Sequence, residues 1–269
     1  MKALAAYTVR QTLRSKGIIA GLAVSLLYLA AVPLLNAVSS TTVMVSNASE
    51  GGTAGAQFLN YALSGLNLLG MFMAVFVALG SIHADIESGT MAMIVTKPLR
   101  RSQVIIGRWA GYALFMAGYV LIIGLVLWLT VVFDTSQPFW NYIPALSLAY
   151  LNVATMMTLT LAVSIFMPAT ANAVLVFLIF IVTSNLNLIN FAGGATDASA
   201  ATTVIDNVFR LSLPVGIVSD QMHGLLVNAG RSTAAASLIP ANLSFVYEAV
   251  YIAVLLLLAT RTFQKKDLV

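Results

Sequence analysis

Six long apolar runs limit what this chain can fold into more than any other feature of its sequence. A helix needs about 20 mostly apolar residues to cross the hydrocarbon core of a bilayer, which is roughly 30 Å thick. The sequence therefore predicts an all-α polytopic membrane protein with six transmembrane helices, forming a single domain over residues 1–269 of the chain. The runs cover about residues 18–38, 61–82, 105–132, 143–166, 171–189 and 243–260.

The composition excludes the main alternatives to a membrane protein. Hydrophobic residues make up 60% of the chain and charged residues only 8%, whereas a soluble domain is about 45–50% apolar and about 25% charged. Such a chain cannot cover itself with polar groups in water. Disorder is excluded as well, because disordered segments combine low hydrophobicity with high net charge. Cysteine is absent, so the chain has no disulfide framework and no thiolate chemistry.

The positions of the charges predict the orientation of the chain in the membrane. With six spans both termini share one side, and of the 13 basic residues only Arg210 and Arg231 lie opposite. Because cytoplasmic segments carry the excess of Lys and Arg, both termini are expected in the cytoplasm, and the protein in the cell (inner or cytoplasmic) membrane. Glu248 is grouped here with the outer acids, so no carboxylate is expected deep in the membrane. The inner basic residues are Lys2, Arg10, Arg14, Lys16, Lys97, Arg100, Arg101, Arg108, Arg261, Lys265 and Lys266.

The segments between the spans differ in what they predict. The link 167–170 is so short that it predicts a tight helical hairpin, and the Ser/Thr/Gly-rich segment 39–60 predicts a flexible loop. Residues 190–242 form a connection too long to lack structure, so one or two external amphipathic helices are expected there. Residues 2–16 predict an interfacial helix, although an ordinary positive flank would have nearly the same sequence.

The loop between the second and third runs predicts a short helix across the membrane face. Gly89 is a helix stop, Pro98 is a break, and Ser102 is a candidate N-cap for the third span. The alternative for this loop is a solvated connector that simply follows the positive-inside rule.

Little in the sequence indicates catalysis by this chain. It contains no G-x-x-x-x-G-K-[ST] motif for binding phosphates. Its two histidines, His83 and His223, fall on opposite sides of the predicted bilayer and cannot share a metal. The methionine pairs at 71/73 and 156/157 could suggest copper, but methionine is also a common apolar filler. We therefore predict a chain that is not an enzyme by itself and that binds neither metal nor cofactor.

Uncharged polar residues within the apolar runs are the remaining candidates for function. They can form hydrogen bonds between helices, or they can line a translocation path. Small residues at a spacing of four, such as Gly70, Ala74 and Ala78, predict close contacts between helices. The candidate path residues are Asn67, Asn152, Thr155, Thr158 and Asn185.

Two stretches of sequence resemble the ABC-2 permease family. The first runs from Asp85 to Arg108 and contains an acidic residue, Gly-Thr, a short apolar run, a proline, an arginine, and then a glycine followed by a basic residue. Arg108 stands there in place of the more usual lysine. The second is the ending from Phe263 to Leu268, in which an aromatic residue precedes basic residues and Asp-Leu.

The resemblance implies a permease subunit of an ATP-binding cassette transporter. Such subunits form dimers with a second copy or a paralogue, and each docks a separate ATPase subunit that binds ATP and magnesium. The loop between spans two and three would be the coupling helix. An extracytoplasmic protein is a further candidate partner, and no nucleic acid is expected. The implied direction of transport is export. The residues implied to contact the ATPase are Asp85, Glu87, Gly89, Thr90, Lys97, Pro98, Arg100 and Arg101.

Two other functions are compatible with the residues themselves. One is a passive channel or secondary carrier that works without an ATPase. The other is a membrane anchor for an enzyme-maturation complex, which would hold a stable partner without moving a solute.

Overall fold

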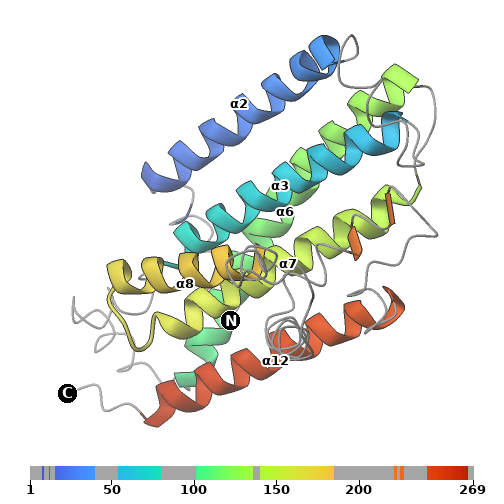
Figure 1. The fold of residues 1–269 in the computed structure, drawn as a ribbon. Helices are drawn as coiled ribbons and strands as arrows, with labels where there is room; N and C mark the ends of the chain where they lie inside the picture. The colour runs from blue at the N-terminus through green and yellow to red at the C-terminus, as the bar shows by residue number, and fades with distance from the viewer. Residues whose placement is uncertain are drawn as a thin grey trace, which may run out of the picture.

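A computed structural model of the chain describes residues 8, 12, 16–39, 54–79, 101–135, 140–184, 221–222, 225–226 and 241–265. Within these residues the chain forms six helices and is all-helical, as predicted (Figure 1). They are α2 (Lys16–Ser39), α3 (Ala54–Ala78), α6 (Arg101–Thr135), α7 (Tyr142–Val163), α8 (Ala169–Ser184) and α12 (Ala241–Lys265).

Each helix overlaps one of the six apolar runs, and four are long and apolar enough to cross a membrane. The four candidate spans are 59–78, 102–133, 142–163 and 243–264. The apolar parts described for α2 and α8 are shorter, at 18–31 and 169–181. The multi-span character of the chain is thus confirmed for four helices, while the count of six spans stays a prediction.

Some predicted boundaries were wrong. Helix α3 begins at Ala54, so part of the segment expected to be a flexible loop is helical. Helix α6 begins at Arg101, which places Ser102 inside the helix rather than at its N-cap. The predicted interfacial and external helices lie mostly outside the described residues. Of the interfacial helix, only Thr8 and Thr12 are described. Of the external helices, only 221–222 and 225–226 are described.

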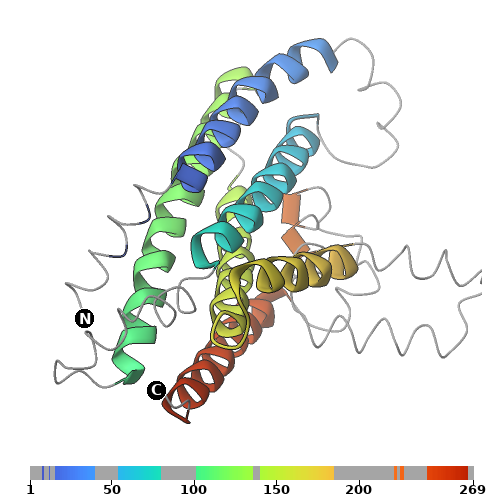
Figure 2. The ribbon, with the colours of Figure 1, turned by 90° about the vertical axis from the view of Figure 1, so that its left-hand side faces the viewer.

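The helices alternate in direction along the chain. Figures 1 and 2 show α2, α6 and α8 running one way and α3, α7 and α12 running the other way. The start of α2 and the end of α12 therefore lie toward the same end of the bundle. Figure 2 also shows α8 leaving the bundle sideways from its junction with α7.

Helices α3, α6 and α7 pack on one another and form the centre of the bundle. Helix α2 packs on α3 and α6, α12 packs on α6 and α7, and α8 packs on α7. All seven consecutive residues from Asn152 to Thr158 are buried. A helix that is buried on every side over two turns must be surrounded by neighbours, so α7 is the central element of the fold.

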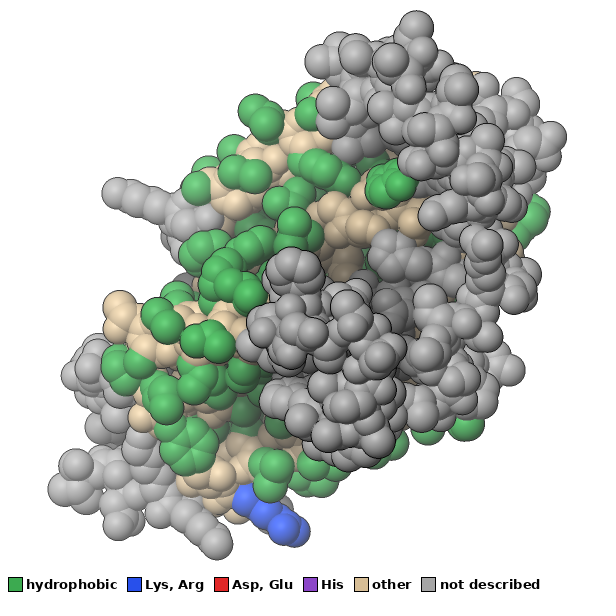
Figure 3. Space-filling view, viewed as in Figure 1, with side chains coloured by type: hydrophobic (Ala, Val, Ile, Leu, Met, Phe, Trp, Pro, Cys, Tyr) green, Lys and Arg blue, Asp and Glu red, His purple; other side chains and the backbone are tan. Residues whose placement is uncertain are grey.

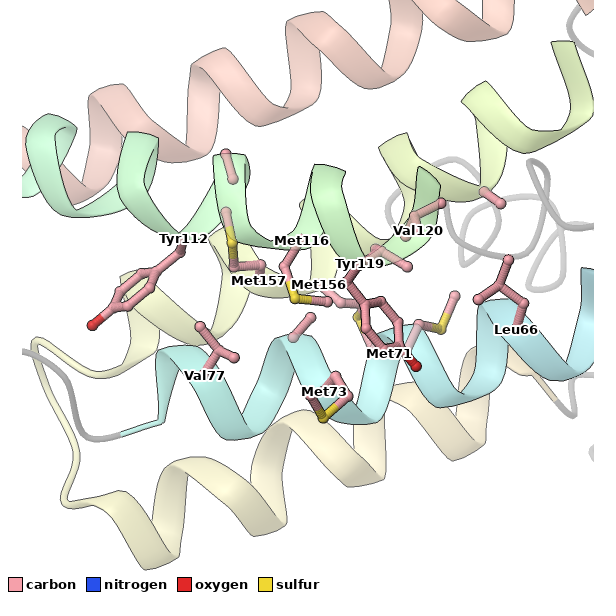
Figure 4. Close-up of a cluster of buried hydrophobic side chains, with 14 of the residues drawn as sticks. Leu66, Met71, Met73, Val77, Tyr112, Met116, Tyr119, Val120, Met156 and Met157 are labelled. Carbon is pink, nitrogen blue, oxygen red and sulfur yellow. The ribbon is translucent and has the colours of Figure 1, made fainter. Parts of the chain in front are cut away.

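Methionine side chains fill much of this core. Met71 of α3, Met116 of α6, and Met156 and Met157 of α7 are each at most 3% exposed, and they lie among buried leucine, valine and tyrosine side chains (Figure 4). This is the behaviour of a flexible apolar filler. The described residues contain no group of three or more His, Asp or Glu side chains that could hold a metal.

The small residues of α3 mark a close approach to α6 and α7. A Cβ atom added to Gly70 would lie 2.8 Å from Cγ2 of Val153 in α7 and 3.8 Å from Cε1 of Tyr119 in α6. Ala74 and Ala78, one and two turns further on, are fully buried. The predicted close contact between helices is therefore confirmed for this stripe.

The outward-facing side chains are apolar. Figure 3 shows hydrophobic side chains over the described helices, with Lys or Arg only at the end of α12 on this face. Large exposed examples are Leu27 on α2, Ile122 on α6, Val174 on α8 and Leu257 on α12. Water would not favour such a surface, whereas lipid tails would, so the bundle is suited to a bilayer.

The link between α7 and α8 is short, as predicted, although it comprises residues 164–168 rather than 167–170. Helix α7 ends at Val163 and α8 begins at Ala169. The Asn172 side chain fastens the two helices together, because its Nδ2 atom donates a hydrogen bond to the carbonyl oxygen of Thr160 at 3.0 Å.

Candidate membrane-embedded polar site

Polar side chains of the central helix α7 are buried in the middle of the bundle. Asn152, Thr155 and Thr158 are at most 2% exposed. The Thr155 hydroxyl donates to the carbonyl oxygen of Leu151 at 3.0 Å, and the Thr158 hydroxyl donates to that of Ala154 at 2.7 Å. Each threonine thus donates its hydroxyl hydrogen within α7, and its hydroxyl oxygen can still accept a hydrogen bond from another group.

Thr158 uses this acceptor for a contact with a neighbouring helix. The Nε1 atom of Trp109 in α6 donates to the Thr158 hydroxyl oxygen at 2.8 Å. For Thr158, the structure therefore shows the hydrogen-bonding role between helices, which was one of the two interpretations of the polar residues.

The structure corrects the placement of Glu248. This residue was grouped with the outer acids, but it lies within α12 and is 0% exposed. It is on the buried face of the helix, between Ser244 one turn before it and Ile252 one turn after it, which are 0% and 7% exposed. The carboxyl group is therefore enclosed by the bundle near the start of a candidate span, rather than exposed on the outer side.

The Glu248 carboxylate faces α7, and the Thr155 hydroxyl is the hydrogen-bonding group beside it. It lies close to the Thr155 hydroxyl, but the single hydrogen of that hydroxyl is donated to Leu151. Neither carboxylate oxygen of Glu248 has a hydrogen bond to any described residue, and the same is true of the Ser244 hydroxyl. We refer to Thr155, Ser244 and Glu248 as the Glu248 cluster.

The other candidate path residues are placed as follows. Asn152 is on α7 one turn before Thr155 and so shares its face. Asn67 is buried on α3, one turn before the close approach at Gly70, and its Oδ1 atom accepts no hydrogen bond from the described residues. Asn185 lies outside the described residues.

The residues expected to contact an ATPase cannot be located in the same way. Arg101 is the first residue of α6, and the remaining seven of the set, from Asp85 to Arg100, lie outside the described residues. Two turns into α6, Arg108 is 9% exposed and therefore buried near the start of that helix.

The sequence did contain a signal for the Glu248 cluster. Ser244, Glu248 and Ile252 are spaced four residues apart, so they lie on one face of a helix. A polar pair followed by an apolar residue on one face indicates that this face packs against protein, since the rest of the span faces lipid. The signal was missed because Glu248 lies only five residues after the start of its apolar run.

The fold and the polar interior define an integral membrane protein of several packed helices. Comparison with known proteins identifies the family more closely. The family described as ABC-2 family transporter protein matches residues 3–268, so the chain belongs to the ABC-2 family and is a membrane permease subunit. The resemblance inferred from the motifs is thereby confirmed.

A curated relative supports the same conclusion over part of the chain. The "Probable ABC transporter permease protein NosY" of Stutzerimonas stutzeri is 30% identical over 99 residues. This match covers 35% of the present chain and 36% of the relative, so it spans little more than a third of either protein.

Proposed function

We propose that this chain is the membrane-spanning half of an ATP-binding cassette exporter. In this proposal it pairs with a second copy or a paralogue, and each permease docks a separate ATPase subunit that holds ATP and magnesium. All six helices cross the cell membrane, and both termini are cytoplasmic. The observation that supports this most strongly is the family match from residue 3 to residue 268, nearly the whole chain.

The arrangement of the helices would allow a movement of the ATPase to be transmitted to the centre of the bundle. The proposed coupling loop connects α3 to α6, and these two helices form the centre of the bundle together with α7. Helix α6 also packs on α12. A push on the loop by the ATPase would therefore move helices that contact both sides of the Glu248 cluster.

The alternating helix directions are consistent with the proposed topology. An even number of spans brings both ends of the bundle's chain to one side, as Figures 1 and 2 show for α2 and α12. Lys16 at the start of α2 and Arg261 near the end of α12 are basic, which supports a cytoplasmic location for that side by the positive-inside rule.

The proposal is tested by weakening the coupling loop in the complex of permease and ATPase. We expect Glu87→Ala and Gly89→Pro to lower the ATPase activity that depends on the permease by about tenfold, which corresponds to roughly 1.4 kcal/mol of lost contact free energy. The variants should still reach the membrane. Asp134→Ala is the matched control, because it removes a carboxylate near the opposite end of α6 and should leave coupling unchanged.

Three outcomes would contradict the proposal. If both loop variants keep wild-type coupling, this loop does not transmit the action of the ATPase. Solute flux in liposomes that contain this chain alone would instead indicate a channel or secondary carrier. A stable enzyme partner without solute flux would indicate a membrane anchor.

A further inference from the structure

We propose that the Glu248 cluster binds the positively charged amine of a transported substrate, and that the substrate class is a primary amine with an apolar body. This inference rests on the proposed function, since it assigns a ligand to a site inside the permease. It starts from one observation, a fully buried carboxyl group whose two oxygens make no well-formed hydrogen bond and beside which the Thr155 hydroxyl already donates its hydrogen to Leu151.

A carboxylate in this position needs a compensating group. Burial of an ionised side chain is costly unless it is paired and hydrogen-bonded, and acidic residues inside membrane proteins mark substrate or ion pathways for that reason. Without such a partner the group would have to hold a proton instead, and a bound cation can take the place of that proton. The cost of burying Glu248 is therefore explained best by a ligand.

The buried arginine of the bundle does not compensate this carboxylate. Arg108 lies two turns into α6, and Glu248 lies two turns into α12. Because α6 and α12 run in opposite directions (Figure 1), these positions are toward opposite ends of the bundle. A positive charge that compensates Glu248 must therefore come from outside the described core.

The atoms around the carboxylate determine the kind of cation. Glu248 offers two acceptor oxygens, and the Thr155 oxygen is also an acceptor because its hydrogen is donated to Leu151. The Ser244 hydroxyl has no partner among the described residues and can accept as well. A primary ammonium carries three N–H donors on one charged atom and matches such a set, while Ile252 in the next turn suits an apolar body.

A ligand can reach this site only when helices move. Glu248 is 0% exposed, so the groups that cover it must move before an amine can enter or leave, and separation of α12 from α7 would achieve this. Helix α6 packs on both of these helices. Motion of α6 would thus open the site in step with the ATPase.

The test follows the chemical accessibility of Glu248 in membranes that contain the whole complex. Dicyclohexylcarbodiimide modifies carboxyl groups in apolar surroundings, and mass spectrometry of the peptide around Glu248 measures the extent of labelling. We expect 2-phenylethylammonium to slow this labelling about tenfold, which corresponds to roughly 1.4 kcal/mol of binding at the concentration used. The neutral analogue 2-phenylethanol, which has nearly the same shape, should not protect.

The variants separate the site from general effects on the membrane. Glu248→Gln should abolish labelling of this peptide, and Asp134→Asn, which changes a carboxylate of α6 outside the cluster, should leave both labelling and protection of Glu248 unchanged. Thr155→Val should reduce the protection while keeping the labelling, because the carboxylate remains and an acceptor is lost.

The results that would overturn the inference do not depend on folding of a variant. Equal protection by the amine and the alcohol, or protection by neither, in the wild-type protein would show that the carboxyl group holds no ammonium. Absence of labelling in the wild type would show that Glu248 never opens to a ligand. Each of these leaves the Glu87 coupling test untouched, so failure of this inference is distinguishable from failure of the proposed function.

Discussion

Gly70 of α3 lies where all three central helices come close together. We expect Gly70→Ala to destabilise the protein by about 1–3 kcal/mol, because the added methyl group would overlap the short, stiff side chain of Val153. The shift is measured as a lower thermal unfolding midpoint in detergent.

Gly118 provides the control for this experiment. It lies in α6, and a Cβ atom added there meets nothing within 4 Å. Gly118→Ala should therefore stabilise the protein by up to about 1 kcal/mol, since alanine restricts the unfolded chain more than glycine does. Equal midpoints for the two variants would contradict the packing at Gly70.

For single residues, the sequence predicted where small side chains allow close packing, but it did not predict which way the Glu248 side chain faces. The stripe Gly70, Ala74 and Ala78 could be recognised because small side chains have one use inside a membrane bundle, which is close approach. Glu248 could not be placed in the same way. Whether a carboxylate near the end of a span faces water or another helix depends on the rotation of α12, and packing against α7 sets that rotation.

Among the contacts between helices, the hairpin of α7 and α8 depends on one side chain, that of Asn172. The Thr160 carbonyl oxygen accepts hydrogen bonds from Nδ2 of Asn172 and from the backbone N–H of Ser164, both at 3.0 Å. We expect Asn172→Ala to cost about 0.5–1.5 kcal/mol and to loosen the start of α8, which hydrogen–deuterium exchange of residues 164–172 would show as faster exchange.

Asn141 at the start of α7 is the matched control. It is exposed and is the N-cap of that helix, yet its side chain makes no capping hydrogen bond. Asn141→Ala should therefore leave both stability and exchange of the hairpin unchanged. Unchanged exchange in Asn172→Ala would mean that packing alone holds α8 in place, for example its contact with α3 through Phe72 and Phe177, whose ring centroids are 5.4 Å apart.

The existence of the elements was easier to predict than their ends. Apolar runs of about 20 residues predict helices in a bilayer because a helix satisfies its backbone hydrogen bonds within one segment. The positions at which the helices begin and end depend on other interactions. Residues from Ala54 onward continue α3 beyond its apolar run, where local hydrogen bonding rather than hydropathy extends the helix, so the run itself gave no sign of the extension.

Orientation is a property of the whole molecule, and the absence of cysteine makes it measurable. We expect Asn141→Cys to react with a membrane-impermeant maleimide on intact cells. Thr170→Cys should react only after the membrane is permeabilised. Both positions are exposed and lie near opposite ends of the α7–α8 hairpin, so the reversed labelling pattern would show that the termini are outside.

The length of α6 has a mechanical consequence. Its 35 residues extend about 52 Å at 1.5 Å per residue, well beyond the roughly 30 Å hydrocarbon core. A rod of this length acts as a lever, because a tilt of about 10° at one end displaces the other end by about 9 Å. A small stroke delivered next to Arg101 would thus arrive at the far face of the membrane as a movement wide enough to admit a small molecule.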